Sequence, residues 1–344
     1  MTRLTLVENL LHRLNILPQP IYDAFLQTLL GRAIMASNKL GLFDRLILKP
    51  STSAELASDL KVSTEGVELL LDALEVAGYV RRRGIMFEPT RMTRKWLNRR
   101  SDYSIKNLLA YFETLHDRWS YLDETIRRGR PEKTYFELFT PDDWCTYTYG
   151  MMDLARLLMP QVLNHIDLPD RAEHIVDIGG SHGLYSIELC RKYPQLHATV
   201  VDFPGAAIHG KQIIRETGFS DRISYLEGDF LEVDLGMMCD AVLSFNIVHG
   251  LRREQNELLA GKVHRTLRPG GNWYVVDEMR TGKKYSNLSG LVSAMVGLHL
   301  FNEVGGRAYS IEEVQEWCES VGFTDVKFWS LQTPGVVLVR SRRV

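Results

Sequence analysis

The pattern of apolar and polar residues divides the chain into two parts with different periods. From residue 21 to about residue 168, most apolar side chains recur at intervals of three and four, as in amphipathic helices. From residue 172 onward, short apolar runs of strand length alternate with helical segments. The first part therefore predicts a helical region, and the second predicts a doubly wound α/β domain.

The first hundred residues predict a set of helices followed by a β-hairpin. We expect a short amphipathic helix over residues 1–17 and a long helix over residues 21–48. Capping residues at Thr52 and at 63–64 indicate the starts of two further helices. Residues 79–87 hold three arginines and a glycine between two short apolar runs, which indicates a hairpin. This order of elements is typical of a winged-helix module.

The second part predicts a seven-stranded sheet. Its first strands are separated by helices and are expected to be parallel. The last two strands are joined by a short link over residues 330–335, which can only connect antiparallel neighbours. We therefore expect a mainly parallel sheet that ends in an antiparallel hairpin. The seven strands are expected near residues 174, 198, 223, 240, 273, 323 and 335.

A glycine-rich turn follows the first of these strands. An apolar run over 174–178 contains Asp177 near its end, and Gly179, Gly180 and Gly183 follow. This spacing differs from the G-x-G-x-x-G of dinucleotide folds, whose helix N-terminus receives a pyrophosphate. An acid in this place would repel a pyrophosphate but would suit a cofactor with a cationic centre and an amino group. S-adenosyl-L-methionine carries both groups.

Two further strands also end in acids. Asp202 ends the second strand, 23 residues after Gly179 (202 minus 179), close to where an acid holds the hydroxyls of a ribose. The third strand is followed by Gly228, Asp229 and Phe230, which offer a carboxylate and an aromatic ring for an adenine. The three acid-tipped strands together predict an adenosyl cofactor at one edge of the sheet.

A histidine and a glutamate follow the fourth and fifth strands. His249 comes shortly after the strand that ends at Phe245, and Glu278 ends the next strand. Both are expected at the carboxyl edge of the sheet, beside the glycine turn. A neutral histidine has a pKa of about 6.5 and suits the removal of a proton from an acidic hydroxyl. A carboxylate at its other ring nitrogen would orient the ring.

Taken together, these residues resemble a known family. The chain is similar to the S-adenosylmethionine-dependent small-molecule O-methyltransferases, which include the plant caffeic acid type, the hydroxyindole type and bacterial polyketide-tailoring relatives. The resemblance covers roughly residues 20–340. It implies a Rossmann-like class I methyltransferase domain preceded by a mainly α winged-helix dimerisation domain. The matching motifs lie at 176–183, 201–204, 228–230, 268–271 and 305–307.

The resemblance also implies roles for individual residues. His249 is expected to be the catalytic base with Glu278 as its partner. The cofactor-binding positions are expected to be Asp177, Gly179, Gly180 and Ser181 near the methionine part, Asp202 and Phe203 at the ribose and adenine, Gly228, Asp229 and Phe230 around the adenine, and Ser244 and Phe245 at the end of the fourth strand. Tyr147 and Met151 fall on pocket-lining positions.

The chain departs from the family pattern on the acceptor side. The family usually reads His-Asp-Trp where this chain has His249, Gly250 and Leu251, and Ala308 stands where a second acid would flank the histidine. Three hypotheses remain: methylation of an acidic oxygen that needs only His249, methylation of carbon or nitrogen, or a non-methylating reaction with the same cofactor. We expect no metal, and we interpret His299 as core or as part of the substrate pocket wall.

Composition limits the possible partners. Lys plus Arg is 41 and Asp plus Glu is 43, giving a formal net charge of −2, which argues against bulk binding of nucleic acid. The helix expected over residues 64–74 also carries Glu65, Glu68 and Asp72 where a recognition helix would read bases. We therefore favour a homodimerisation module over a DNA-binding, metabolite-sensing regulator, and expect a small-molecule acceptor as the other partner.

Cysteine usage and hydropathy indicate the compartment. The four cysteines are far apart and match no metal or redox spacing, and no apolar run approaches the roughly 18 residues of a membrane span. We expect a cytoplasmic protein without a membrane segment. The predicted domains are a dimerisation domain over residues 1–100, a helical linker and substrate-pocket segment over residues 101–170, and the catalytic domain over residues 171–344.

Overall fold

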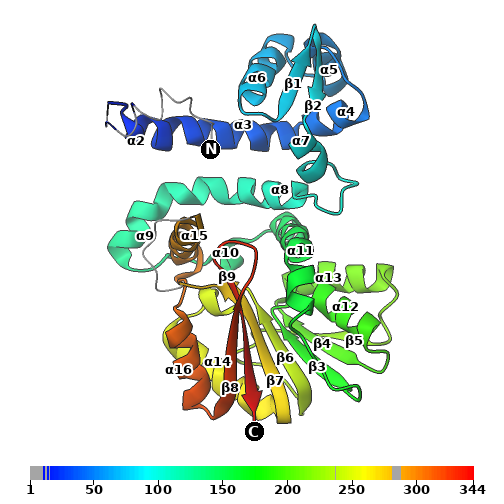
Figure 1. Cartoon of the computed structure of the whole chain (residues 1–344), viewed down its shortest axis with the longest axis vertical. Helices are drawn as coiled ribbons and strands as arrows, with labels where there is room; N and C mark the ends of the chain where they lie inside the picture. Colours follow the sequence, from blue (N-terminus) through cyan, green and yellow to red (C-terminus); the bar gives the residue numbers. More distant parts are fainter. Residues whose placement is uncertain (1–10, 12–13, 15, 237, 281–287) are drawn as a thin grey trace. The chain divides into compact units, whose positions relative to one another are not determined.

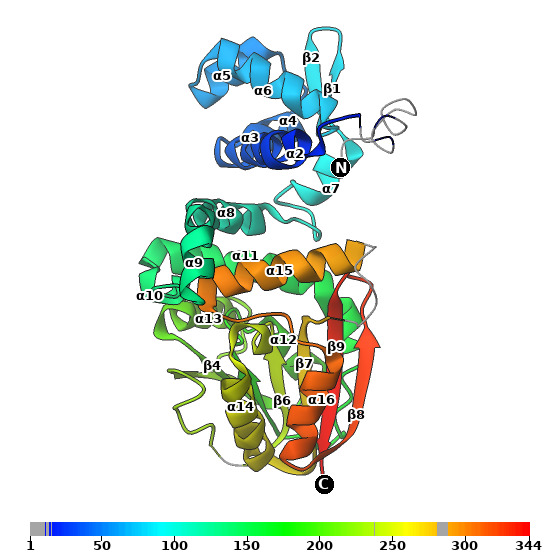
Figure 2. The same ribbon diagram turned by 90° about the vertical axis from the view of Figure 1, so that its left-hand side faces the viewer.

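The chain forms two compact units, residues 1–113 and residues 114–344. Figure 1 and Figure 2 show the elements of each unit from two directions. The domain limits predicted from the sequence stay a prediction. The computed structural model describes residues 11, 14, 16–236, 238–280 and 288–344.

The first unit contains the predicted helices and hairpin. Thr52 and Glu55 form the expected capping box at α5, and Ser63 caps α6. Apolar side chains of α4, α5 and α6 fill its core, among them Leu42, Leu56 and Leu71. The elements are α2 (Gln19–Ile21), η1 (Tyr22–Leu26), α3 (Gln27–Lys39), α4 (Leu42–Leu48), α5 (Ser53–Leu60), α6 (Thr64–Val76), β1 (Val80–Arg83), β2 (Met86–Pro89), α7 (Arg91–Trp96) and most of α8 (Lys106–Leu115). Most of the helix expected over residues 1–17 lies outside the described residues.

The single helix predicted over residues 21–48 is wrong in one respect. η1 has π-helical geometry, α3 ends at Lys39, and α4 begins at Leu42. Gly41 adopts a left-handed conformation with a φ of 75°, which glycine reaches without the penalty of a side chain and which commonly ends a helix. Apolar residues recur on both sides of the break, and this periodicity hid it.

Each of the three arginines of the hairpin forms an ion pair with an acidic residue of the same unit. They belong to β1, and residues 84 and 85 form the turn. The ion pairs join Arg81 and Arg83 to Glu88, and Arg82 to Asp72 and Glu75. The positive charge of these arginines is therefore balanced inside the unit.

The second unit is built around the predicted seven-stranded sheet. Its strand order is β5–β4–β3–β6–β7–β9–β8. The first five strands in this order are parallel, and β9 is antiparallel to both β7 and β8. The strands are β3 (His174–Ile178), β4 (His197–Asp202), β5 (Ile223–Glu227), β6 (Cys239–Phe245), β7 (Leu267–Glu278), β8 (Phe323–Ser330) and β9 (Val336–Arg343). The predicted fold class is therefore confirmed.

Helices cover both faces of this sheet. One buried cluster joins the sheet to α11 (Pro141–Leu163), α12 and α13, and the other joins its opposite face to α14 and α16 (Figure 2). The sheet helices are α12 (Leu184–Lys192), α13 (Pro204–Glu216), α14 (Arg253–Thr266) and α16 (Ile311–Ser320). No helix within the described residues is long and apolar enough to span a bilayer.

A further group of helices lies beyond the carboxyl ends of the strands. The helix α15 packs against η2, α9 and η3. These elements are η2 (His116–Tyr121), α9 (Leu122–Arg128), α10 (Tyr135–Leu138), α11 (Pro141–Leu163), η3 (Val248–Gly250) and α15 (Leu288–Val304). They bring side chains from distant parts of the sequence to the edge of the sheet where β3, β4, β6 and β7 end.

Candidate functional site

A cavity lies at the carboxyl edge of the sheet, between the glycine turn, α11 and the end of β6. Seven of the residues predicted as site residues line it, and so do four that the sequence reasoning missed. The predicted residues are Tyr147, Met151, Asp177, Gly179, Gly180, Ser181 and Phe245. The missed residues are Ala155, His182, Tyr185 and Asn246. The unusual histidine inside a glycine turn was the available signal for His182.

The glycine turn has a backbone that only small residues allow. Gly179 and Gly183 have φ values of 66° and 67°, and Ser181 is also left-handed with a φ of 39°. A Cβ on Gly180 would lie 2.6 Å from Cγ of Asp177 and 2.8 Å from Cγ1 of Val200. The turn therefore presses its main chain against β3 and β4 and leaves the cavity open on its other side.

Two buried carboxylates support this turn. Asp177 accepts a hydrogen bond of 2.7 Å from the Ser186 hydroxyl, and burial raises the pKa of Asp177 to about 7. Asp202 accepts the backbone N–H groups of Ser181 at 2.8 Å and Phe203 at 2.7 Å. Burial raises the pKa of Asp202 to about 6, against the opposing effect of these N–H donors. Both acids are thus held where their ionised form lacks water and would gain from a cationic neighbour.

The other predicted cofactor residues lie outside the lining of this cavity. Gly228 has a φ of 148°, and its N–H donates to the Asp202 carbonyl at 2.9 Å, which joins the ends of β5 and β4. The Asp229 carboxylate accepts the N–H of Leu231 at 2.8 Å. The carbonyl of Phe230 accepts a hydrogen bond of 2.9 Å from Lys262.

Phe203 and Ser244 differ from each other in their surroundings. The ring of Phe203 packs with Phe136 and Trp144, at centroid distances of 5.5 and 6.2 Å. Ser244 is fully buried, and its hydroxyl accepts the indole N–H of Trp273 at 3.0 Å. Phe203 therefore belongs to an aromatic cluster beside the end of β4, whereas the side chain of Ser244 is engaged inside the sheet.

His249 contacts two carboxylates through one ring nitrogen. Nδ1 of His249 lies 3.1 Å from Oε2 of Glu278, and it also contacts Oδ1 of Asp277. The fully buried Asp277 carboxylate accepts the backbone N–H of His249 at 3.2 Å and that of Glu278 at 2.9 Å. The sequence reasoning named Glu278 but missed Asp277, although the adjacent acids at the end of a strand were the available signal.

The two carboxylates control the protonation of this imidazole. Burial alone would lower the pKa of His249, but the charges and hydrogen bonds of Asp277 and Glu278 outweigh it and raise the pKa to about 10. Burial raises the pKa of Asp277, while the interaction with His249 keeps the pKa of Glu278 low. At neutral pH the ring is therefore an imidazolium whose Nδ1 proton faces the carboxylates.

His299 lies on α15 near this group. Its ring stacks on Trp119 with a centroid distance of 5.9 Å and an interplanar angle of 3°. Burial lowers the pKa of His299 to about 4, with a further contribution from the charge of His249, so this ring stays neutral. One group among the described residues brings metal-ligand atoms within 4.8 Å of one another, and it consists of His249, Asp277 and Glu278 without His299.

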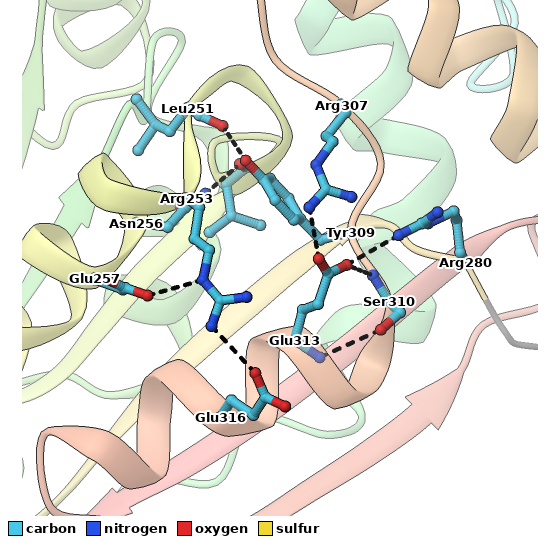
Figure 3. A network of polar contacts seen from close by, with 11 residues as sticks. Leu251, Arg253, Asn256, Glu257, Arg280, Arg307, Tyr309, Ser310, Glu313 and Glu316 are labelled. Atoms are coloured by element: carbon cyan, nitrogen blue, oxygen red, sulfur yellow. Dashed lines mark hydrogen bonds and ion pairs between the residues drawn. The ribbon is translucent and has the colours of Figure 1, made fainter.

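The loop after α15 fixes the backbone of η3. The N–H of Arg307 donates to the carbonyl of His249 at 2.8 Å, and a Cβ on Gly306 would collide with that carbonyl. Glu313 of α16 pairs with Arg307 at 2.5 Å and with Arg280 at 3.0 Å (Figure 3). Glu313 thereby joins the loop to the segment that follows β7, two residues after Glu278.

A second contact in Figure 3 reinforces this loop. The hydroxyl of Tyr309 donates to the carbonyl of Leu251 at 2.7 Å. Ala308, which stands where the family has a second acid, is buried, and a Cβ on Gly297 would lie 3.5 Å from its side chain. The loop thus reaches η3 through a main-chain hydrogen bond and the hydroxyl of Tyr309.

A comparison with models of protein families identifies the family of this chain. A family model described as an O-methyltransferase domain matches residues 119–324, more than half of the chain. The chain belongs to this O-methyltransferase family. The match spans the glycine turn, His249 and the loop before α16.

Individual relatives are similar to this O-methyltransferase along most of their length. The Tetracenomycin polyketide synthesis 8-O-methyl transferase TcmO of Streptomyces glaucescens is 26% identical over 316 residues, covering 90% of this chain and 92% of that protein. The N,N-dimethyltransferase OxyT of Streptomyces rimosus is 24% identical over 308 residues, covering 85% and 87%. The crystal structure of human N-acetylserotonin methyltransferase in complex with SAM has a TM-score of 0.84 at 21% identity, covering 100% of this chain and 99% of that one. The structural likeness confirms the fold.

Proposed function

We propose that the protein transfers a methyl group from S-adenosyl-L-methionine to a hydroxyl of a small aromatic or polyketide-like metabolite. The observation that carries this proposal is the group of His249, the buried Asp277 and Glu278, which lies at the same edge of the sheet as the cavity of the glycine turn. Membership of the O-methyltransferase family supports the reaction class.

The residues around the cavity suit the proposed cofactor. Asp177 and Asp202 are buried acids whose raised pKa values would fall again beside a cationic ligand. The Ser181 hydroxyl is buried and has no hydrogen-bond partner among the described residues, as expected for a group reserved for a ligand. Gly179, Gly180 and Ser181 would hold the amino-acid part, Asp202 the ribose, and Phe203, Gly228, Asp229 and Phe230 the adenine. When bound, the cofactor supplies the electrophilic methyl group.

His249 is proposed to be the general base. With Nδ1 held by Asp277 and Glu278, the atom left to receive the proton of the acceptor hydroxyl is Nε2. Because the pKa of His249 is raised to about 10, Nε2 must lose its proton before it can act as a base. The positive charge of a bound cofactor would lower the pKa of His249 and so favour this loss. Proton removal of this kind contributes about 10²–10⁴-fold to a rate. Orientation of the two reactants contributes most of the remaining barrier reduction.

The acceptor is proposed to bind between α11 and α15. Tyr147 and Met151 line the cavity from α11, and His299 and Trp119 present a stacked pair of flat rings on the side of η2 and α15. Flat apolar surfaces favour a planar, conjugated acceptor. The relative TcmO acts in polyketide synthesis, which agrees with this acceptor class.

Methylation of nitrogen is the second candidate. It is favoured by the raised pKa of His249, because an amine acceptor is nucleophilic without a strong base. The relative OxyT, an N,N-dimethyltransferase, supports the same hypothesis. Transfer to an amine would leave turnover of a His249→Ala variant within a few-fold of wild type, whereas transfer to a hydroxyl would lose it.

A turnover assay tests the function. The protein is incubated with S-adenosyl-L-methionine and a panel of phenolic, hydroxynaphthoate and aminated polycyclic acceptors, and methylated products are detected by mass spectrometry. We expect His249→Ala to lose O-methylation while its affinity for the cofactor stays near wild type. His197→Ala, at the exposed amino end of β4, is the matched control. Wild-type protein that binds no adenosyl cofactor by calorimetry would overturn the proposal.

We further propose a homodimer formed through the first unit. Ile21, Phe25 and Leu29 are spaced by four residues along one helical face and are 55%, 57% and 50% exposed. A contiguous apolar face of this kind usually marks an interface. Light scattering of Phe25→Glu should show a lower mass than wild type, while Leu69→Glu, at a leucine of α6 that is 66% exposed, should not. A wild-type mass of one chain would refute the dimer.

A further inference from the structure

A lysine side chain of α14 binds the main chain of the loop that follows β5. Nζ of Lys262 donates to the carbonyls of Phe230 at 2.9 Å and Leu231 at 3.1 Å, and it also contacts the carbonyl of Val233. An ammonium group has three hydrogens, so these three carbonyls match its full capacity as a donor. The positive charge of Lys262 is therefore used to hold a stretch of backbone.

The hydrogen bonds inside the loop explain why its carbonyls need a cation. The N–H groups of Glu232 and Val233 both donate to the carbonyl of Asp229, at 2.9 and 2.8 Å, which closes a single helical turn. The carbonyls at the end of such a turn have no N–H partner within it, and they carry the negative end of its dipole. A positive side chain at that end satisfies these carbonyls and stabilises the turn.

The helix α14 gives this lysine a fixed base. Leu259 and Val263, on either side of Lys262 in the sequence, are fully buried in the cluster that joins α14 to the sheet. Burial lowers the pKa of the Lys262 ammonium, and among the nearby charges that of Asp229 opposes this effect most strongly. The ammonium is thus a partly desolvated charge close to Asp229, and its contacts with the loop are correspondingly strong.

The segment that the ammonium holds adjoins the positions assigned to the ribose and the adenine. A Cβ on Gly228 would lie 2.5 Å from Cγ1 of Val233, so the side chain of Val233 packs directly on Gly228. The N–H of Gly228 donates to the carbonyl of Asp202 at 2.9 Å. Oδ1 of Asp229 accepts the N–H of Leu231 at 2.8 Å, whereas its Oδ2 makes no hydrogen bond within the described part of the chain.

We propose that Lys262 is a positioning residue that holds the loop over residues 228–234 in the form in which Asp229 and Phe230 recognise an adenine. This inference rests on the cofactor assignment made under the proposed function. Oδ2 of Asp229 can accept a hydrogen bond from the exocyclic amino group of adenine, but not from the carbonyl that replaces this group in hypoxanthine. Lys262 thereby contributes to the choice of base from α14, through the main chain of the loop.

The binding test compares two ligands that differ in one substituent of the base. S-adenosyl-L-homocysteine carries adenine, and S-inosyl-L-homocysteine carries hypoxanthine. Calorimetric affinities for both are measured on wild type, Lys262→Met and Lys262→Arg. Lys211→Met is the matched control, because Lys211 forms an ion pair with the side chain of Glu227, immediately before Gly228. Lys262→Gln takes the place of Lys262→Met if the latter does not fold.

We expect Lys262→Met to weaken binding of S-adenosyl-L-homocysteine about tenfold, because the loop would then adopt its binding form for only about a tenth of the time. The preference of wild type for adenine over hypoxanthine, at least about tenfold, should narrow to about twofold. Lys262→Arg, whose guanidinium also donates to carbonyls, should keep the preference. Lys211→Met should change neither affinity.

The outcomes separate this inference from the proposed function. An unchanged preference in Lys262→Met, the same narrowing in Lys211→Met, or a wild type without a preference would overturn the inference and leave the proposed methyl transfer intact. Wild-type protein that binds neither ligand would overturn both.

Hydrogen exchange of the free protein gives a second readout that needs no ligand. The amides of Glu232 and Val233 are protected by the turn, so the peptide over residues 228–236 should exchange at least about tenfold faster in Lys262→Met than in wild type. The peptide over residues 177–183, from the glycine turn, should exchange at the wild-type rate. Equal exchange of residues 228–236 in wild type and variant would show that Lys262 does not hold the loop, and would overturn the inference.

Discussion

Replacement of Asp277 by asparagine tests how the imidazole of His249 is controlled. The change removes one negative charge from a fully buried position and keeps the side-chain volume. The Asp277 carboxylate is the largest of the influences that raise the pKa of His249 from 6.5 to about 10. Without it, the pKa should move most of the way back toward 6.5, with Glu278 alone holding Nδ1.

The same substitution should also disturb the orientation of the ring. The amide of an asparagine can donate to Nδ1, which would place the remaining proton on Nε2 and block it as a base. We therefore expect the turnover number at neutral pH to fall by about 10²-fold, within the range of general-base contributions of about 10²–10⁴-fold. The KM for the cofactor should change little, because Asp277 does not line the cavity.

A pH–rate profile and a ¹³C-detected titration of the histidine imidazole measure these effects. The matched variant Glu278→Gln removes the second carboxylate, and it should lower the pKa of His249 by a smaller amount because Asp277 remains. Asp277→Asn with an unchanged acid limb in the profile and wild-type turnover would refute the reasoning, since the buried carboxylate would then have no influence on the reacting ring.

Three further predictions concern charge in the buried site. The folded-state pKa of His249 is raised, so its stabilising effect is complete below pH 6.5 and is lost as the pH rises toward about 10; the difference in free energy of unfolding between wild type and His249→Asn should shrink over that interval in urea titrations. Asp177 has a pKa raised from 3.8 to about 7, so the stability that it costs builds up over that interval and is complete above it; Asp177→Asn should raise the melting temperature at pH 8 without ligand while weakening cofactor binding, and a lower melting temperature would contradict this. Asp202→Ala should weaken binding of S-adenosyl-L-homocysteine by at least about tenfold in calorimetry, and an unchanged affinity would mean that the ribose is bound elsewhere.

The sheet and the glycine turn could be predicted because their signals are local. Buried parallel strands read as short apolar runs, and every predicted strand is present. The break at Gly41 was missed because apolar residues recur at helical spacing on both sides of it, and in the prediction this pattern of nearly thirty residues outweighed one glycine. Local pattern therefore predicted element types well and boundaries less well.

The candidate site was harder to predict, because its contacts join residues far apart in sequence. The sequence indicated that Glu278 would approach His249, but not that Asp277 also reaches the same nitrogen. The family resemblance implied a cofactor contact for Ser244, whereas the structure engages its hydroxyl with Trp273. Which of two adjacent residues faces a ligand depends on strand register and on neighbouring side chains, and sequence pattern alone does not fix either.

The ion pairs of Glu313 have a consequence for how the enzyme responds to its medium. Arg280 and Arg307 are 40% and 45% exposed at their side chains, so dissolved ions compete for both of them. Because this junction braces the loop beneath the reacting histidine, added salt should slow catalysis even with an uncharged acceptor. This dependence of the rate on salt would originate in α16, through Glu313, which is not among the residues that line the cavity.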